Sequence, residues 1–138
     1  MARFEKFEDL KIWLLAREIC NDIFELFETT PIGKEYALRN QMNRCSGSIM
    51  DNIAEGFERN GNREFIQYLS ISKASCGELR SQLHRALDRK YIDEEVSEGL
   101  LEKLILESRQ ISSFITCLTN FDYRGTKFIK PWALNFKL

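Results

Sequence analysis

Two helical patterns meet at Asn52-Ile53-Ala54-Glu55-Gly56-Phe57-Glu58-Arg59, the stretch that decides the fold. Before it, apolar residues recur every three or four positions, which predicts a helix over residues 36–59. The expected inward positions of that helix are Leu38, Met42, Cys45, Ile49 and Ile53. Around them lie the small residues Ser46, Gly47, Ser48, Ala54 and Gly56. Because each helical glycine costs up to ~1 kcal/mol relative to alanine, these small residues indicate close approach of another helix.

The turn Asn60-Gly61-Asn62 follows this stretch directly. We expect Gly61 to take a left-handed conformation that ends one helix and Asn62 to cap the next. The next helix is predicted over residues 62–90. Its inward positions alternate in spacings of four and three, as is typical of bundle packing. They are Phe65, Leu69, Ser72, Cys76, Leu79, Leu83 and Ala86.

A first helix is predicted over residues 8–28, before a break that contains Pro31 and Gly33. Its apolar arc is unusually wide. One stripe consists of Leu10, Trp13, Leu14, Cys20, Phe24 and Phe27. A second stripe beside it consists of Ile12, Ala16, Ile19, Ile23 and Leu26. An arc this wide exceeds what the other helices of one bundle would cover, so we predict a second buried face, interpreted as a subunit contact.

A last helix is predicted over residues 93–120, with Asp93 as its N-cap. Its expected inward positions are Leu101, Leu104, Ile111, Ile115 and Leu118, with Leu100 and Phe114 alongside. Short connections make successive helices antiparallel neighbours. The predicted fold class is therefore all-α, an antiparallel up-down-up-down four-helix bundle over residues 1–120 with a C-terminal extension over 121–138.

The 138 residues suffice for one domain, and charged residues interrupt every apolar run, so no membrane-spanning segment and no membrane partner are predicted. The first residues lack the apolar core of a signal peptide, and we expect a cytoplasmic protein. Net charge is −1 overall. Residues 1–30 and 93–120 sum to −3 and −4, whereas residues 31–92 and 121–138 sum to +3 each. Positive charge therefore collects in the middle helices and in the C-terminal extension.

The extension alternates aromatic and basic residues, with Phe121, Tyr123, Phe128, Trp132 and Phe136 interleaved with Arg124, Lys127, Lys130 and Lys137. Two interpretations stay open. Such a segment could stack on nucleic-acid bases. It could instead lie across a hydrophobic groove of its own or a neighbouring bundle, which the number of large apolar side chains favours.

Catalytic chemistry finds little support in the sequence. The four cysteines fall one per predicted helix, but Cys117 sits on the order of 15 Å from the level of the others, so a tetrahedral metal site is not expected. A di-iron centre of the ferritin type needs a histidine on each of two helices, and His84 is the one histidine of the sequence. The sequence also lacks a nucleophile elbow and a glycine-rich phosphate-binding loop. We predict a non-enzymatic protein with no cofactor and no metal.

The run from Ser48 to Gly56, followed by Arg59, Arg63, Glu64 and Phe65, resembles the motif of proteins encoded in 23S rRNA intervening sequences. Relatives of this S23-like family include accessory proteins of diversity-generating retroelements. The resemblance also takes in Phe7 to Trp13 and covers about residues 7–120. It implies a four-helix bundle assembled as a homopentamer. For the retroelement relatives it implies binding of nucleic acid and of a reverse transcriptase through basic surfaces.

Within the motif, Asn52, Ile53, Ala54, Glu55 and Gly56 are interpreted as structural. Glu55 is expected to be partly buried and paired with an arginine or with backbone donors, and Asn52 could bridge helices through its amide. On this interpretation, Glu55→Ala should lower stability or disrupt assembly.

Our first functional hypothesis is an oligomeric bundle that binds structured RNA or DNA, or a nucleoprotein, through basic rims. The candidate residues are Arg39, Arg44, Arg59, Arg63, Arg80, Arg85, Arg89 and Lys90. The chain is slightly acidic where nucleic-acid-binding members of the family are strongly basic, so binding should be confined to a patch. The alternative is a protein-interaction scaffold that uses the apolar face of the first helix, or the extension, and binds no nucleic acid.

Overall fold

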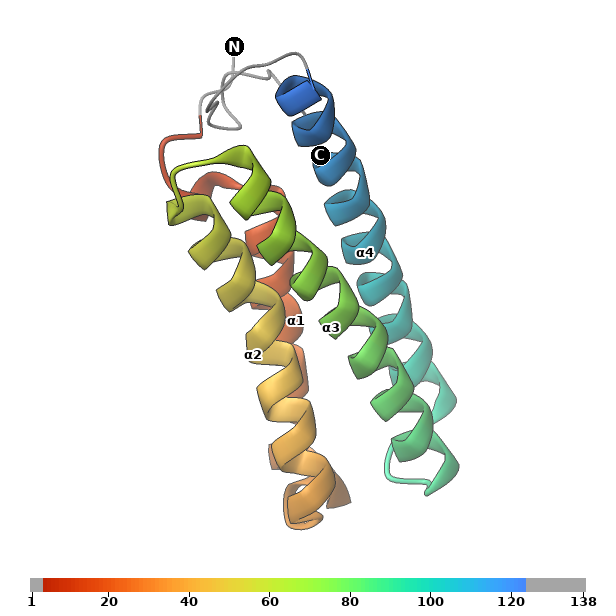
Figure 1. Cartoon of the computed structure of the whole chain (residues 1–138). Coiled ribbons are helices and arrows are strands. Elements are labelled where there is room, and N and C mark those ends of the chain that lie inside the picture. Colours follow the sequence, from red (N-terminus) through yellow and green to blue (C-terminus); the bar gives the residue numbers. More distant parts are fainter. Residues whose placement is uncertain (1–3, 124–138) are drawn as a thin grey trace.

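The computed structural model describes residues 4–123, with side chains described as far as Asn120. Within this range the chain forms long helices and no strand, and the predicted four-helix bundle is confirmed (Figure 1). The long helices are α1 (Lys11–Thr29), α2 (Tyr36–Glu58), α3 (Asn62–Asp88) and α4 (Glu94–Tyr123). Two short 3-10 turns, η1 (Phe7–Asp9) and η2 (Pro31–Lys34), precede and follow α1. None of the described helices is long and apolar enough to cross a membrane.

The helix α4 continues to Tyr123, three residues beyond its predicted end, so the C-terminal extension begins later than expected. Conversely α3 ends at Asp88, two residues before the predicted Lys90. The remaining extension, with Arg124, Lys127, Phe128, Trp132 and their neighbours, lies outside the described residues.

The α2–α3 pair forms the tightest part of the core. Every inward position predicted for these two helices is buried. Two polar groups are paired across the contact, where the Ser72 hydroxyl donates to the Ile49 carbonyl at 2.7 Å and the Cys45 thiol donates to the Ser75 carbonyl at 3.1 Å. Buried polar atoms with partners of this kind fix the relative height of the two helices.

In α1 the stripe that forms the core is the second one. Ile12, Ala16, Ile19, Ile23 and Leu26 are buried. In the first stripe, Leu10 is buried just before α1 begins, but Leu14 and Phe24 remain 46% and 58% exposed. Trp13 packs at the surface against Phe7, with 5.2 Å between ring centroids. Because both stripes are equally apolar, only contact with α2 and α4 decides which one faces inward. The described chain thus leaves an exposed apolar face on α1.

The core stripe of α4 differs from the predicted one by about one residue. Leu100, Leu104, Ile111, Phe114 and Leu118 are buried, whereas Leu101 and Ile115 are half-buried. The buried positions continue the four-three spacing only if Glu107 is included, and Glu107 is indeed fully buried. Neither of its carboxylate oxygens has a hydrogen-bond partner among the described residues. The apolar stripe of α4 therefore contains one unpaired acidic side chain.

The turn between α2 and α3 does not use the predicted capping. Gly61 has a φ of −133° and is the N-cap position, so it is not left-handed. Asn62 is the first residue of α3, and its buried amide has no described hydrogen-bond partner. The positive φ, 61°, belongs to Lys90 in the α3–α4 connection. There Asp93 acts as the predicted N-cap, accepting a hydrogen bond from the Val96 N–H at 2.9 Å.

Candidate nucleic-acid interface

The candidate basic residues lie mainly on α2 and α3, but they do not form one patch. Arg39 and Arg59 are separated by most of α2, about 30 Å at ~1.5 Å per residue. Since α3 runs antiparallel to α2, Arg63 falls at the Arg59 end, and Arg85, Arg89 and Lys90 fall at the other. The antiparallel packing therefore divides the predicted rim into two groups at opposite ends.

At the first end, the charge of Arg59 is engaged by its neighbours. Its Nη2 donates to Glu55 Oε2 at 2.9 Å and to Tyr68 Oη at 2.7 Å, and its Nη1 lies 3.8 Å from Glu64 Oε2. The guanidinium also covers the Tyr68 ring at 5.1 Å. Hydrogen bonding to Arg59 lowers the pKa of Glu55, and hydrogen bonding to Glu55 raises the pKa of Tyr68. With two carboxylates beside it, Arg59 offers little net positive charge to a phosphate.

Toward the other end, four cations follow one another along the α2–α3 pair, and we call them the α2–α3 basic edge: Arg44, Arg85, Arg89 and Lys90. The Arg85 Nη2 donates to Gln41 Oε1 on α2 at 2.7 Å. Because the helices are antiparallel, Arg44 lies about one turn from Gln41 toward the Arg59 end, and Arg89 lies about one turn from Arg85 toward the opposite end. About 10 Å along the bundle separates them at ~1.5 Å per residue.

The described residues provide no carboxylate within ion-pair distance of any of the four cations of the basic edge. Carboxylates do lie nearby, since Glu78 lines the same small hollow as Arg44, and Asp88, Asp93 and Glu94 line the hollow that Lys90 lines.

The positions of Arg85, Arg89 and Lys90 also suit the α3 helix itself. They stand at its C-terminal end, where cations interact favourably with the helix macrodipole. Holding Arg85 by a neutral amide leaves its full charge available for a second partner, unlike the carboxylate pairing of Arg59. The basic edge is therefore the part of the predicted rim that can best neutralise phosphates.

Two of the predicted residues lie elsewhere. Arg39 points toward the α1 side, where its Nη1 donates to the Gly33 carbonyl at 3.1 Å and its guanidinium covers the Tyr36 ring at 4.6 Å. Arg80 is half-buried and lies about 140° around α3 from Arg85, at ~100° per residue. Lys90 is also five residues from Arg85, but it lies beyond the end of α3, where its φ of 61° redirects the chain, so this helical angle does not apply to it. Neither Arg39 nor Arg80 shares the face of the basic edge.

The motif residues take structural positions at the α2–α3 contact. Ile53 is buried, Ala54 is half-buried, and Gly56 meets α3 directly, as its missing Cβ would lie 2.7 Å from Tyr68 Cβ. The Asn52 amide donates to the carbonyl and hydroxyl oxygens of Ser48 at 2.8 and 2.9 Å. Ser48 in turn shares a hydrogen bond of 2.9 Å with Ser75 on α3, so Asn52 reaches α3 through a hydroxyl rather than directly.

Glu55 departs from its expected setting, because its side chain is 53% exposed rather than partly buried. Its pairing with Arg59 spans one turn of the same helix and is open to solvent. Exposed pairs of this kind contribute little to stability. We therefore expect Glu55→Ala to leave the melting temperature and the molecular mass nearly unchanged, as measured by circular dichroism and light scattering. A large drop in either quantity would restore the assembly role first assigned to Glu55.

Thiol and metal chemistry have no clear site in the described part of the chain. The four cysteines are free, and no group of three or more His, Cys, Asp or Glu residues could hold a metal ion among the described residues. Burial raises the pKa of Cys45 to about 12 and also raises the pKa of Cys76. Thiols so strongly protonated are poor nucleophiles.

The profile of the 23S rRNA-intervening sequence protein family matches residues 8–113, which include both central helices and the basic edge. The chain belongs to this family. A crystal structure of a protein of unknown function from the S23 ribosomal protein family of Bacteroides thetaiotaomicron VPI-5482 has the same fold. It has a TM-score of 0.70 and 21% identity, covering 75% of this chain and 97% of that one. No curated protein matches the chain significantly.

Sequence reasoning missed Gln41, the residue that holds Arg85 in the basic edge. The two are 44 positions apart, and a glutamine on an exposed helical face carries no local signal. It also missed the groove between α1 and α4, for which a mid-helix glycine, Gly99, was the one local sign.

Proposed function

We propose that this 23S rRNA-intervening sequence protein is a non-enzymatic, self-associating bundle in the cytoplasm that binds structured RNA or DNA through the α2–α3 basic edge. The observation that carries the proposal is the cluster of Arg44, Arg85, Arg89 and Lys90, which has no carboxylate within ion-pair distance among the described residues. Clustered cations of this kind neutralise phosphates and release counterions.

Self-association is supported by the exposed apolar face of α1 and by the family resemblance, which implies a homopentamer. A ring would repeat the basic edge in each subunit and so compensate for the net charge of −1. The relation to retroelement accessory proteins, and with it a reverse transcriptase partner, stays a prediction.

The double variant Arg85→Glu/Arg89→Glu should weaken nucleic-acid binding by tenfold or more at low salt. Each lost duplex phosphate contact removes ~0.9 from the slope of log affinity against log salt, so the slope should fall by about 2 per binding subunit. Fluorescence anisotropy of a labelled structured RNA and a matched duplex DNA, each titrated at several salt concentrations, measures both quantities.

The matched control is Lys11→Glu/Arg109→Glu, which changes net charge equally at exposed positions of α1 and α4. If both double variants weaken binding to the same extent, overall charge rather than the basic edge is responsible. If the unaltered protein binds neither probe at low salt, the nucleic-acid proposal is wrong.

A protein-interaction scaffold is the second candidate function. It is favoured by Leu14 and Phe24, two large apolar side chains that remain about half exposed on α1. Exposed apolar patches mark interaction surfaces more often than chance would produce them. Under this alternative, Leu14→Lys/Phe24→Lys should release a co-purifying protein, while the charge reversals in the basic edge should not.

A further inference from the structure

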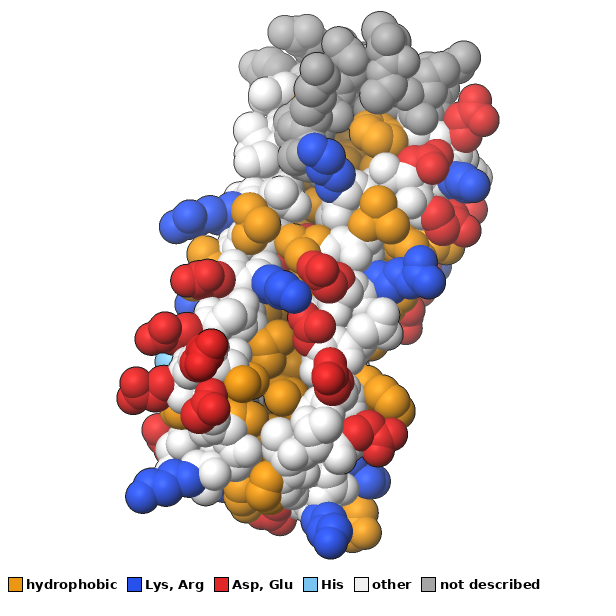
Figure 2. All heavy atoms as spheres, turned by 180° about the vertical axis from the view of Figure 1, so that it is seen from behind, with side chains coloured by type: hydrophobic (Ala, Val, Ile, Leu, Met, Phe, Trp, Pro, Cys, Tyr) orange, Lys and Arg blue, Asp and Glu red, His pale blue; other side chains and the backbone are white. Residues whose placement is uncertain are grey.

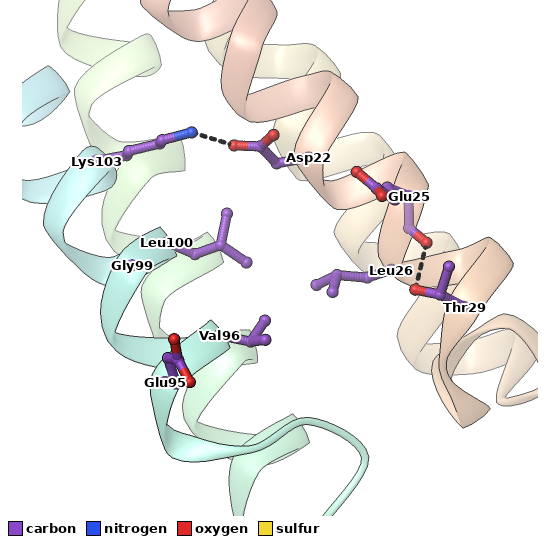
Figure 3. A pocket seen from close by; sticks show the side chains of 9 residues that line it. All are labelled: Asp22, Glu25, Leu26, Thr29, Glu95, Val96, Gly99, Leu100 and Lys103. Atoms are coloured by element: carbon purple, nitrogen blue, oxygen red, sulfur yellow. Dashed lines mark hydrogen bonds and ion pairs between the residues drawn. The ribbon is translucent and has the colours of Figure 1, made fainter.

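A groove lies between α1 and the first half of α4. It has a cavity volume of 450 Å³, within the range of roughly 300–1,000 Å³ typical of binding pockets. Leu26, Val96 and Leu100 form its apolar floor and face one another across the gap (Figure 3). Val96 is 40% exposed there, so the groove presents a hydrophobic surface to solvent.

The rim of the groove is acidic. Asp22, Glu25 and Glu95 line it, and its one cation, Lys103, is already paired with Asp22 at 2.6 Å and with Glu18 at 3.7 Å. On the face of the molecule opposite to that of Figure 1, hydrophobic side chains run along a furrow with acidic side chains on both sides (Figure 2). Such a surface complements a segment that combines apolar and basic side chains.

The chain contains one such segment. Residues 124–138 carry four basic residues and no acidic one, together with Phe128, Trp132 and Phe136. Tryptophan is the residue type most often found as an anchor in a buried pocket. Charge and hydrophobicity therefore match this segment to the groove.

Chain length decides which copy supplies the segment. The floor of the groove lies 23 to 27 residues before Tyr123 on α4, about 35–40 Å along the helix. Residues 124–132 span at most about 32 Å when fully extended. Even with the length of its side chain added, Trp132 of the same chain could touch only the near end of the floor, and only as a straight, fully extended strand, so the segment of a second copy is the better fit.

We propose that the groove between α1 and α4 binds residues 124–138 of a second copy of the chain, with Trp132 as the anchoring side chain on Leu26, Val96 and Leu100. The acidic rim then neutralises the basic residues that flank the tryptophan. This inference rests on the self-association in the proposed function, and it names the segment and the surface that carry it.

Trp132 itself can report the contact. The chain has two tryptophans, so the full-length Trp13→Phe protein emits from Trp132 alone. Acrylamide quenching of this emission should be severalfold weaker in the assembled protein than after dilution to monomers, with the mass at each concentration determined by light scattering. Quenching as strong in the assembly as in the monomer overturns the proposal. Shielding that persists in the monomer also overturns it, because the segment would then dock within one chain.

Gly99 permits a direct blocking variant. A Cβ at this position would meet nothing within 4 Å, and Gly99 lines the groove, so Gly99→Leu starts a bulky side chain there from an open position. It should raise the quenching of Trp132 severalfold toward the monomer value. The matched control is Gly77→Leu, at an exposed glycine of α3 that is equally open, and it should leave the quenching unchanged. Equal effects of the two variants, or no effect of Gly99→Leu, overturn the proposal.

A second variant, in the acidic rim, tests whether an effect of Gly99→Leu comes from the groove or from a folding defect. Glu25→Lys/Glu95→Lys reverses two exposed charges of the rim and should also expose Trp132, with an unchanged circular dichroism spectrum. The mass in solution distinguishes a failure of self-association from a failure of the groove proposal. A protein that remains monomeric at every concentration contradicts self-association as a whole, whereas an assembled protein with exposed Trp132 contradicts the groove alone.

Discussion

Replacing Glu107 by glutamine should remove most of the pH dependence of the bundle's stability between about pH 5 and pH 8. Glu107 is fully buried in α4, and its two carboxylate oxygens have no hydrogen-bond partner among the described residues. Burial raises the pKa of this carboxyl from its ordinary value of 4.5 to about 9. The pKa of Cys76, on α3, is raised by burial and, to a smaller extent, by the charge of the Glu107 carboxylate.

The sign of the effect follows from where the proton is bound. Below pH 4.5 the carboxyl is protonated in both the folded and the unfolded chain, so it adds no pH dependence. Between pH 4.5 and about 9 only the unfolded chain releases the proton, so the free energy of unfolding falls by about 1.4 kcal/mol per pH unit. Above about pH 9 both states are ionised and the slope ends.

Denaturant unfolding at a series of pH values measures this slope. The parent protein should lose about 4 kcal/mol over three pH units because of Glu107, and Glu107→Gln should lose little of that amount. The matched control is Glu102→Gln, at an exposed position of the same helix, which should keep the slope of the parent. Parallel curves for Glu107→Gln and the parent would show that the carboxyl is hydrated or paired in solution.

Glu107→Leu tests the same buried carboxyl by replacing it with an apolar side chain of similar size. Leucine would complete the four-three stripe of α4 between Leu104 and Ile111, and it has no group to ionise. We expect it to raise the free energy of unfolding at pH 7 by about 3 kcal/mol, the cost of keeping the carboxyl protonated in the core.

Glu107 is also a core residue of this fold that the sequence pattern did not predict. An acidic residue inside an apolar stripe breaks the pattern, so the sequence predicted a stripe that included Leu101 and Ile115 and avoided Glu107. The helices α2 and α3, each with a single clear stripe, were predicted with every inward residue correct. In α1, two apolar stripes lie side by side, and the choice between them depends on tertiary packing that no local pattern encodes.

The candidate site was predictable only by residue type. Composition identified the arginines of the middle helices, but their division between two ends follows from the antiparallel pairing of α2 and α3. Whether an arginine can bind a phosphate depends on the side chains that already pair with it. Arg59 pairs with Glu55 four residues earlier on the same helix, a spacing that the sequence shows. Arg85 pairs with Gln41 on a different helix, and no local spacing in the sequence indicates that contact.

Replacing Gly56 by alanine should destabilise the bundle by about 1–3 kcal/mol, although alanine is the better helix former. A Cβ on Gly56 would lie 2.7 Å from Tyr68 Cβ, 2.9 Å from Phe65 Cδ1 and 3.3 Å from the Phe65 carbonyl oxygen. Tyr68 Cβ is fixed by its own backbone and cannot rotate away. The clash must therefore be relieved by moving α3 or the Phe65 ring.

Neither movement is easy in this core. The Phe65 ring packs against Phe57 at 6.0 Å and against Phe114 at 5.5 Å, so a shift would be transmitted to all three aromatic residues. Packed interiors respond to an added methyl group with strain because they contain few voids that could absorb it. Urea unfolding at pH 7 measures the loss, and an unchanged m-value would show that both proteins unfold as the same cooperative unit.

Gly77→Ala is the matched control and should have the opposite sign. Gly77 lies exposed in the middle of α3, and a Cβ added to it would meet nothing within 4 Å, so alanine there should stabilise by up to ~1 kcal/mol. If Gly56→Ala were also stabilising, α2 and α3 would be farther apart in solution than in this structure. Opposite signs would instead show that the glycine at the end of the Asn52–Gly56 motif is required for the close approach of the two helices, which is a packing role and not a chemical one.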